Sequence, residues 1–163
     1  GNGGYNIHRG MAHITSGYVE DLFALYLAKK LDRMDLQYLV DKVTSIRFSK
    51  NGKATTFKPD LSIINSENVL THYFDLKTNL GWTRDLASYL QIKNEFINKI
   101  RGRKAWIHFD KGNVQEITIS EKIKYKMVVI YGWNINKNQI AHFSKSGSSP
   151  ILVVNPVLTP VFS

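Results

Sequence analysis

The segment from residue 57 to residue 79, FKPDLSIINSENVLTHYFDLKTN, constrains the fold more than any other part of the chain. Two apolar runs, LSII and VLTHYFDLK, are separated by the polar residues NSEN, and this pattern predicts an antiparallel hairpin. Pro59 restricts the backbone just before Asp60, which is typical of a strand start or an edge. Pairing around the turn brings Asp60 and Asp75 to the same, open end of the hairpin.

Helical patterns flank this hairpin. Thr15 or Ser16 is suited to cap a helix that runs to about Leu31. The segment 34–42, MDLQYLVDK, is interpreted as a second short helix. After the hairpin, Thr83 is expected to cap another long helix, which carries a rough apolar stripe at helical spacing and ends in the basic cluster RGRK.

Further strands are predicted on both sides of these elements. VTSIRFSK and KATTF surround Asn51-Gly52, a strong two-residue hairpin turn. KAWIHF, VQEITI, YKMVVIYGW and ILVVN follow the second long helix and read as additional strands. The expected fold is therefore a single α/β (α+β) domain over 1–163, with its core at about 14–133 and a C-terminal edge strand and tail at 144–163.

Charge indicates the class of partner. The chain has 22 Lys and Arg residues against 13 Asp and Glu residues, a net charge of +9. A domain this basic gains free energy by releasing counterions from a polyanion, so nucleic acid is the first partner to consider and an acidic membrane surface the second. No apolar run approaches the roughly 20 residues of a membrane-spanning helix. The absence of cysteine excludes disulfides and thiolate metal sites, and it fits a reducing cytoplasm.

The charged residues of the hairpin need an explanation, because strands that face a core normally lack charge. Asp75 and Lys77 are two positions apart on a strand and share a face, and the hairpin brings Asp60 near them. Two convergent carboxylates repel each other unless a cation lies between them, and Mg²⁺ prefers such oxygen ligands. A surface ion pair between Asp75 and Lys77 is the simpler interpretation. The apolar surroundings of both acids favour the metal site, since an unpaired buried carboxylate is costly.

Pro59-Asp60 and Asp75-Leu76-Lys77 resemble the motif of the PD-(D/E)XK nuclease superfamily, which includes many restriction endonucleases. The resemblance covers the order helix, hairpin and helix over about residues 14–104. It implies a restriction endonuclease-like core, in which a mixed central sheet is flanked by helices. It also implies that the two motif acids bind Mg²⁺, for which Mn²⁺ substitutes, and that the motif lysine is catalytic.

Many members of that superfamily add a glutamate from the N-terminal helix. Glu20 is the candidate here, because it shares a helix face with Phe23 and Leu27, and Asp21 is its rival. In the exonuclease-like branch of the family, a glutamine is followed four residues later by tyrosine. Here Gln91 is followed by Glu95, which favours a restriction-type or structure-specific endonuclease.

The expected activity is Mg²⁺-dependent hydrolysis of DNA phosphodiester bonds. An RNA endonuclease with the same chemistry and a non-catalytic nucleic-acid-binding module on the same fold remain alternatives. Candidate phosphate contacts on or after the second long helix are Arg84, Lys93, Arg101, Arg103 and Lys104. For each of them a solvated basic surface is the competing interpretation. The apolar C-terminal tail is a candidate homodimer contact, and cleavage of both strands by one such site requires a dimer or two successive events.

Overall fold

The structure, a computed structural model, describes residues 4–10, 14–77, 86–130 and 151–154. The helices are α1 (Ile14–Leu31), α2 (Leu86–Ile100) and the short 3₁₀ helix η2 (Asp110–Gly112). The strands are β1 (Asn6–Arg9), β2 (Gln37–Val40), β3 (Thr44–Ile46), β4 (Thr55–Phe57), β5 (Leu61–Ile64), β6 (Val69–Lys77), β7 (Lys104–His108), β8 (Val114–Ile130) and β9 (Ile151–Val154). They form one sheet in the order β1-β2-β5-β6-β8-β7-β3-β4, with β9 paired to β8.

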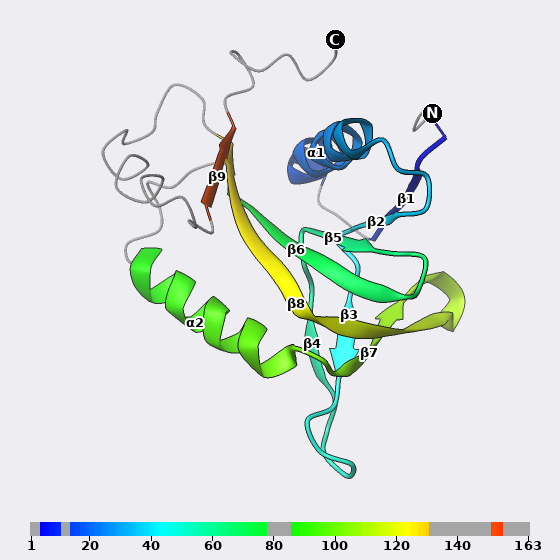
Figure 1. Ribbon diagram of the computed structural model, residues 1–163, viewed down its shortest axis with the longest axis vertical. Helices are drawn as coiled ribbons and strands as arrows, with labels where there is room; N and C mark the ends of the chain where they lie inside the picture. Colours follow the sequence, from blue (N-terminus) through cyan, green and yellow to red (C-terminus); the bar gives the residue numbers. More distant parts are fainter. Residues whose placement is uncertain (1–3, 11–13, 78–85, 131–150, 155–163) are drawn as a thin grey trace.

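The sheet is mixed, and the two long helices lie on opposite faces of it (Figure 1). β5 and β6 are antiparallel, whereas β6 and β8 run parallel with α2 in the crossover between them. The α/β (α+β) character expected from the sequence is confirmed. In the described ranges, neither long helix combines the length and the hydropathy that a membrane span requires.

Strand alternation divides the core into two layers. On one face of β6, Phe74 packs against Phe23 of α1, with ring centroids 5.6 Å apart. On the other face, Tyr73 lies in the cluster that includes Leu90 and Ile97 of α2. Burial of each large apolar side chain contributes about 1.5–3 kcal/mol, so these two layers fix α1 and α2 against the central strands. β6 therefore presents Asp75, two positions after Tyr73, to the α2 side.

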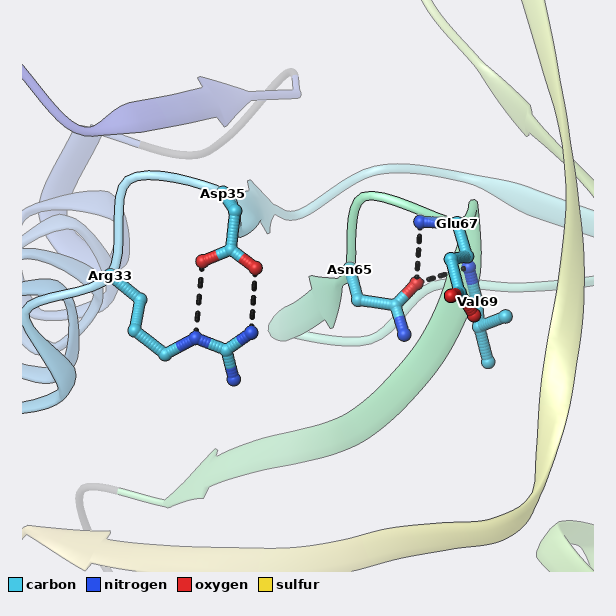
Figure 2. A network of polar contacts seen from close by, with 5 residues as sticks. All are labelled: Arg33, Asp35, Asn65, Glu67 and Val69. Atoms are coloured by element: carbon cyan, nitrogen blue, oxygen red, sulfur yellow. Dashed lines mark hydrogen bonds and ion pairs between the residues drawn. The ribbon is translucent and has the colours of Figure 1, made fainter.

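The hairpin of β5 and β6 has the predicted strand boundaries. Asn65 closes its turn: the Oδ1 atom accepts hydrogen bonds from the backbone N–H groups of Glu67 and Val69, both at 3.0 Å (Figure 2). This use of an Asn side chain in place of a backbone acceptor explains why the polar NSEN segment reverses the chain. In the register of the hairpin Leu61 lies opposite Phe74, which leaves Asp60 and Asp75 at its open end.

The predicted helix at 34–42 is wrong, because the segment contains β2. Asp32 has a φ angle of 47°, the left-handed conformation that commonly follows a helix end. Arg33 then donates two hydrogen bonds to Asp35, at 3.0 and 2.6 Å, within the connection (Figure 2). Tyr38, Leu39 and Val40 of β2 are buried, and a short run that is apolar on both faces is typical of an internal strand.

β8 also differs from the prediction, which had separated VQEITI from YKMVVIYGW. One continuous strand runs from Val114 to Ile130, and it pairs along one edge with β6. Its other edge pairs with β7 in the first part and with β9 at the end. Polar residues such as Glu121 and Lys122 interrupt the apolar pattern without ending the strand, and both are exposed where the register with β6 shifts between Ile119 and Lys124. The last predicted strand residues, 131–133, lie outside the described residues.

The β3–β4 hairpin is present with shorter strands than predicted. The Asn51-Gly52 dipeptide lies in a wider loop, where the Gly52 N–H donates to the Ser49 carbonyl oxygen at 3.2 Å. α2 begins at Leu86 and ends at Ile100, before the RGRK cluster, and the predicted cap Thr83 lies outside the described residues.

Candidate active site

The open end of the β5–β6 hairpin brings three predicted site residues together. Asp60 lies immediately before β5, and Asp75 and Lys77 share one face at the end of β6. The Oδ2 atom of Asp60 accepts a hydrogen bond of 2.7 Å from the backbone N–H of Leu76. That bond holds the Asp60 carboxylate beside the strand residues that carry the other two side chains.

Electrostatics links the same three groups. Burial is the largest cause of a raised pKa at Asp60, and the N–H of Leu76 opposes it. The negative charge of Asp75 raises the pKa of Asp60 further, whereas the positive charge of Lys77 lowers it. Asp60 and Asp75 are therefore close enough to repel each other, which is the condition under which a shared cation becomes favourable.

Asp75 is the most deeply buried acid of the site, with 5% of its surface exposed. Its Oδ2 atom accepts a hydrogen bond of 2.8 Å from the Tyr125 hydroxyl and one of 3.1 Å from the Tyr89 hydroxyl. The Nζ atom of Lys93 lies 3.1 Å from the same oxygen. Donors from α2 and β8 thus offset the cost of removing this carboxylate from water.

The two tyrosines are fixed as donors. Burial, followed by the negative charge of Asp75, raises the pKa of Tyr89 and of Tyr125 well above the usual value of 10. Both hydroxyl groups therefore stay protonated at neutral pH. A protonated phenol can donate to Oδ2, so the orientation of the Asp75 carboxylate is set by the protein.

Aromatic rings surround the two lysines. Lys93 Nζ donates a hydrogen bond of 3.1 Å to the Tyr73 hydroxyl and lies 5.0 Å from the centroid of that ring. The ring of Tyr89 is close to both lysines: its centroid is 5.7 Å from Lys93 Nζ and 5.1 Å from Lys77 Nζ. Cation–π contacts of this kind restrain an ammonium group more tightly than solvent does.

The two oxygens of each aspartate differ in their contacts. Within the described part of the chain, all hydrogen bonds to Asp60 and Asp75 side chains go to Oδ2, and Oδ1 of each accepts none. Carboxylate oxygens are hard ligands suited to Mg²⁺ or Mn²⁺, so the donor chemistry fits a divalent cation. The described residues contain no group of three or more His, Cys, Asp or Glu side chains arranged for a metal.

Glu20 and Asp21 differ in their position on α1. Glu20 is half-buried and its Oε2 atom is enclosed by protein, whereas Asp21 is exposed. In the described residues, neither forms a three-carboxylate metal group with Asp60 and Asp75. The role of a helix glutamate at the site stays a prediction.

Asp41 is a neighbour of the site that sequence reasoning missed. It is buried with a φ angle of 54°, and its backbone N–H donates to the Asp60 carbonyl oxygen at 3.1 Å. Its carboxylate pairs with Lys58 at 3.1 Å, and its charge adds to the raised pKa of Asp60. Nothing in the sequence around Asp41 indicates that this residue lies beside Asp60.

The predicted phosphate-binding residues have varied surroundings, and Arg84 lies outside the described residues. Lys93 points at Asp75. Arg101 donates to the carbonyl oxygens of Glu121 and Ile123 at 3.1 and 2.9 Å, which ties the end of α2 to β8. Arg103 donates to the Lys99 carbonyl oxygen at 2.9 Å, and Lys104 pairs with Glu116 at 3.5 Å.

Sequence reasoning missed the tyrosines and the inward role of Lys93. Two spacings carried a signal: Tyr73 is two positions before Asp75 on one strand face, and Tyr89 is four before Lys93 on one helix face. Tyr125 carried none, because its contact depends on the parallel register of β8 with β6.

No family model, curated protein or solved structure matches the chain. The geometry of the site must therefore carry the functional interpretation.

Proposed function

We propose that the protein is a divalent-metal-dependent nuclease that hydrolyses phosphodiester bonds, with DNA as the favoured substrate. The observation that carries this proposal is the cluster of Asp60, Asp75 and Lys77 at the open end of one hairpin, in which Oδ1 of each carboxylate accepts no hydrogen bond from a described residue. Two convergent hard ligands beside a lysine are the groups that metal-assisted hydrolysis of a phosphodiester requires.

The arrangement of the elements supports the finer proposal of a restriction endonuclease-like core. α1 precedes the β5–β6 hairpin and α2 follows it, with the two helices on opposite faces of a mixed sheet. This is the order that the PD-(D/E)XK resemblance implies. Hydrolysis with inversion at phosphorus and a 5′-phosphate product are parts of the same proposal.

The roles of the residues follow from their positions. A divalent cation bound through Asp60 and Asp75 would supply polarisation of the phosphodiester and a water of lowered pKa. Tyr89 and Tyr125 hold Asp75 Oδ2, so that the other oxygen of this carboxylate faces away from them. Lys77, on the same strand face, is placed to orient a water molecule or to stabilise negative charge on phosphorus.

The overall charge of +9 favours a polyanionic substrate and an affinity that falls as salt rises. The residues of the site do not select between deoxyribose and ribose, so RNA is the second substrate to test. A nucleic-acid-binding module without catalysis needs no buried Asp75 beside a half-buried Asp60 and a lysine, and burial of a carboxylate is costly. The catalytic interpretation explains that cost.

The test is nicking and linearisation of supercoiled plasmid by the purified protein with Mg²⁺, Mn²⁺ or EDTA. Asp75→Asn is the matched variant, since the amide keeps the size and an acceptor oxygen for the two tyrosines. We expect cleavage only by the wild type and only with metal, while Asp75→Asn still binds the plasmid. A labelled single-stranded RNA under the same conditions tests the second substrate.

Cleavage by Asp75→Asn at the wild-type rate would show that the activity resides elsewhere. Binding to DNA and RNA without cleavage of either, with both metals, would instead support a binding module. Sedimentation of the protein on DNA in the presence of Ca²⁺ shows whether one copy or two engage the duplex.

A further inference from the structure

The position of the Lys93 ammonium group is the least expected feature of the site. Sequence reasoning places this lysine on a basic helix surface, yet only 20% of its side chain is exposed and its Nζ atom lies 3.1 Å from Asp75 Oδ2. A second contact, the hydrogen bond of 3.1 Å to Tyr73, fixes the ammonium from another direction. Lys93 therefore holds a positive charge beside Asp75, the acid that is proposed to bind the metal.

Its surroundings hold the ammonium in place. The rings of Tyr73 and Tyr89 lie 5.0 and 5.7 Å from Nζ, and both belong to elements fixed by the core. A solvated surface lysine samples many rotamers, whereas a lysine between two rings and a carboxylate is restrained. The charge consequently acts at a nearly constant distance from Asp75.

A cation bound to Oδ1 of Asp75 would lie on the same carboxylate as the Lys93 ammonium group, which contacts Oδ2. Like charges a few ångströms apart repel strongly in a partly buried site, where the effective dielectric constant is far below that of water. Lys77, on the same strand face as Asp75, adds a second positive charge, with Nζ 5.1 Å from the centroid of the Tyr89 ring. Two fixed ammonium groups beside two aspartates leave little net negative charge for a divalent ion.

We infer that Lys93 is a positioning residue that serves as the resident counter-ion of Asp75 and lowers the affinity of the site for divalent cations. This inference rests on the proposed function. It implies that the protein alone binds Mg²⁺ weakly, and that the negative charge of a nucleic-acid phosphate is needed to offset Lys93 and complete the site. Metal loading is then coupled to the presence of substrate.

The experiment is calorimetric titration of the protein with Mn²⁺ and Ca²⁺, without nucleic acid, for the wild type and three variants. Lys93→Met removes the charge and keeps most of the apolar stem. Lys93→Arg keeps the charge. Lys99→Met removes one charge from the same helix at a position where Nζ lies over Phe48, 4.3 Å from the ring centroid.

We expect Lys93→Met to bind both cations at least tenfold more tightly than the wild type, and Lys93→Arg and Lys99→Met to stay within threefold of it. An unchanged or weaker affinity of Lys93→Met would overturn the inference. An equal gain in Lys99→Met would also overturn it, because net charge rather than position would then be the cause. A tenfold gain in Lys93→Arg would exclude the role of the charge.

Thermal unfolding provides a second readout if Lys93→Met folds poorly. Without its counter-ion the buried Asp75 destabilises the fold, and a divalent cation should restore the unfolding midpoint of Lys93→Met by more than it raises that of the wild type. An equal metal-induced shift in both proteins would contradict the inference. The proposed function itself would be overturned if the wild type neither bound cations nor cleaved nucleic acid. Only the inference about Lys93 would be overturned if cleavage depended on metal but Lys93→Met bound cations with unchanged affinity.

Discussion

The hydroxyl group of Tyr125 donates a hydrogen bond of 2.8 Å to Asp75 Oδ2, across the parallel pairing of β8 with β6. Removal of this donor in Tyr125→Phe leaves a buried carboxylate with one partner fewer. We expect a loss of about 1–3 kcal/mol in the free energy of unfolding. Urea denaturation followed by circular dichroism measures it.

Tyr26→Phe is the control for this prediction. Tyr26 is half-buried on α1, and its hydroxyl makes no hydrogen bond with any described residue. The control should lie within about 0.5 kcal/mol of the wild type. A Tyr125→Phe protein as stable as the control would show that the bond contributes nothing to the fold.

Asp75→Ala should be far less stable than Asp75→Asn. Alanine removes the acceptor of both tyrosines and leaves the ammonium of Lys93 without its carboxylate in a largely buried position. Loss of one partner of such a pair costs about 3–5 kcal/mol. The amide of the Asn variant retains an acceptor, so its loss should be smaller. Equal urea midpoints for the two variants would contradict the proposed role of the Lys93–Asp75 pair.

Asp60→Asn should stabilise the protein in EDTA at neutral pH. The fold raises the pKa of Asp60 above the ordinary value of 3.8, chiefly by burial, so the folded state favours the protonated acid. The associated stability is fully present below pH 3.8 and is lost as the pH rises through the higher folded pKa. Asn keeps an acceptor for the Leu76 N–H and carries no charge.

Unfolding midpoints of the wild type and Asp60→Asn, recorded in EDTA from pH 3 to pH 8, test this expectation. The two curves should meet at the acid end and separate above it, with the variant more stable at pH 7. Parallel curves across the whole range would mean that Asp60 does not titrate differently in the folded protein.

Lys77→Met should reduce cleavage about 10²–10⁴-fold, the usual contribution of a residue that transfers or orients a proton in hydrolysis. Stability should change little, because methionine keeps most of the apolar stem of the half-buried Lys77 and only the contact of its ammonium with the Tyr89 ring is lost. Single-turnover cleavage with saturating Mg²⁺ measures the rate. Lys50→Met, in the exposed β3–β4 loop, is the control, and a Lys77→Met rate within threefold of that control would remove Lys77 from the mechanism.

The β5–β6 hairpin could be predicted because everything that specifies it is local. Apolar runs, a polar turn and Pro59 lie within one short segment, and the Asn65 turn depends on residues at most four positions apart. The segment 34–42 could not be assigned in this way. Its apolar residues fit a helix or a buried strand equally well, and β2 is decided by its neighbours β1 and β5.

The residues of the site also fall into those that local sequence predicts and those that depend on tertiary packing. Asp60, Asp75 and Lys77 belong to one hairpin, and their proximity follows from its register. Tyr89 and Lys93 reach Asp75 only because α2 packs with one particular face on β6, and Tyr125 reaches it only through the β6–β8 register. Helix rotation and parallel register are tertiary properties that no short sequence window contains.

The parallel pairing of β8 with β6 also governs when the site can exist. Asp75 leaves the ribosome 14 residues before Tyr89 and 50 residues before Tyr125. Until both have joined, its carboxylate is oriented by solvent rather than by the protein. Parallel pairs form late, since the loop between the strands must close first. If the site hydrolyses nucleic acid, a nascent or partly folded chain does not cleave nucleic acid. The activity begins only when the sheet is complete.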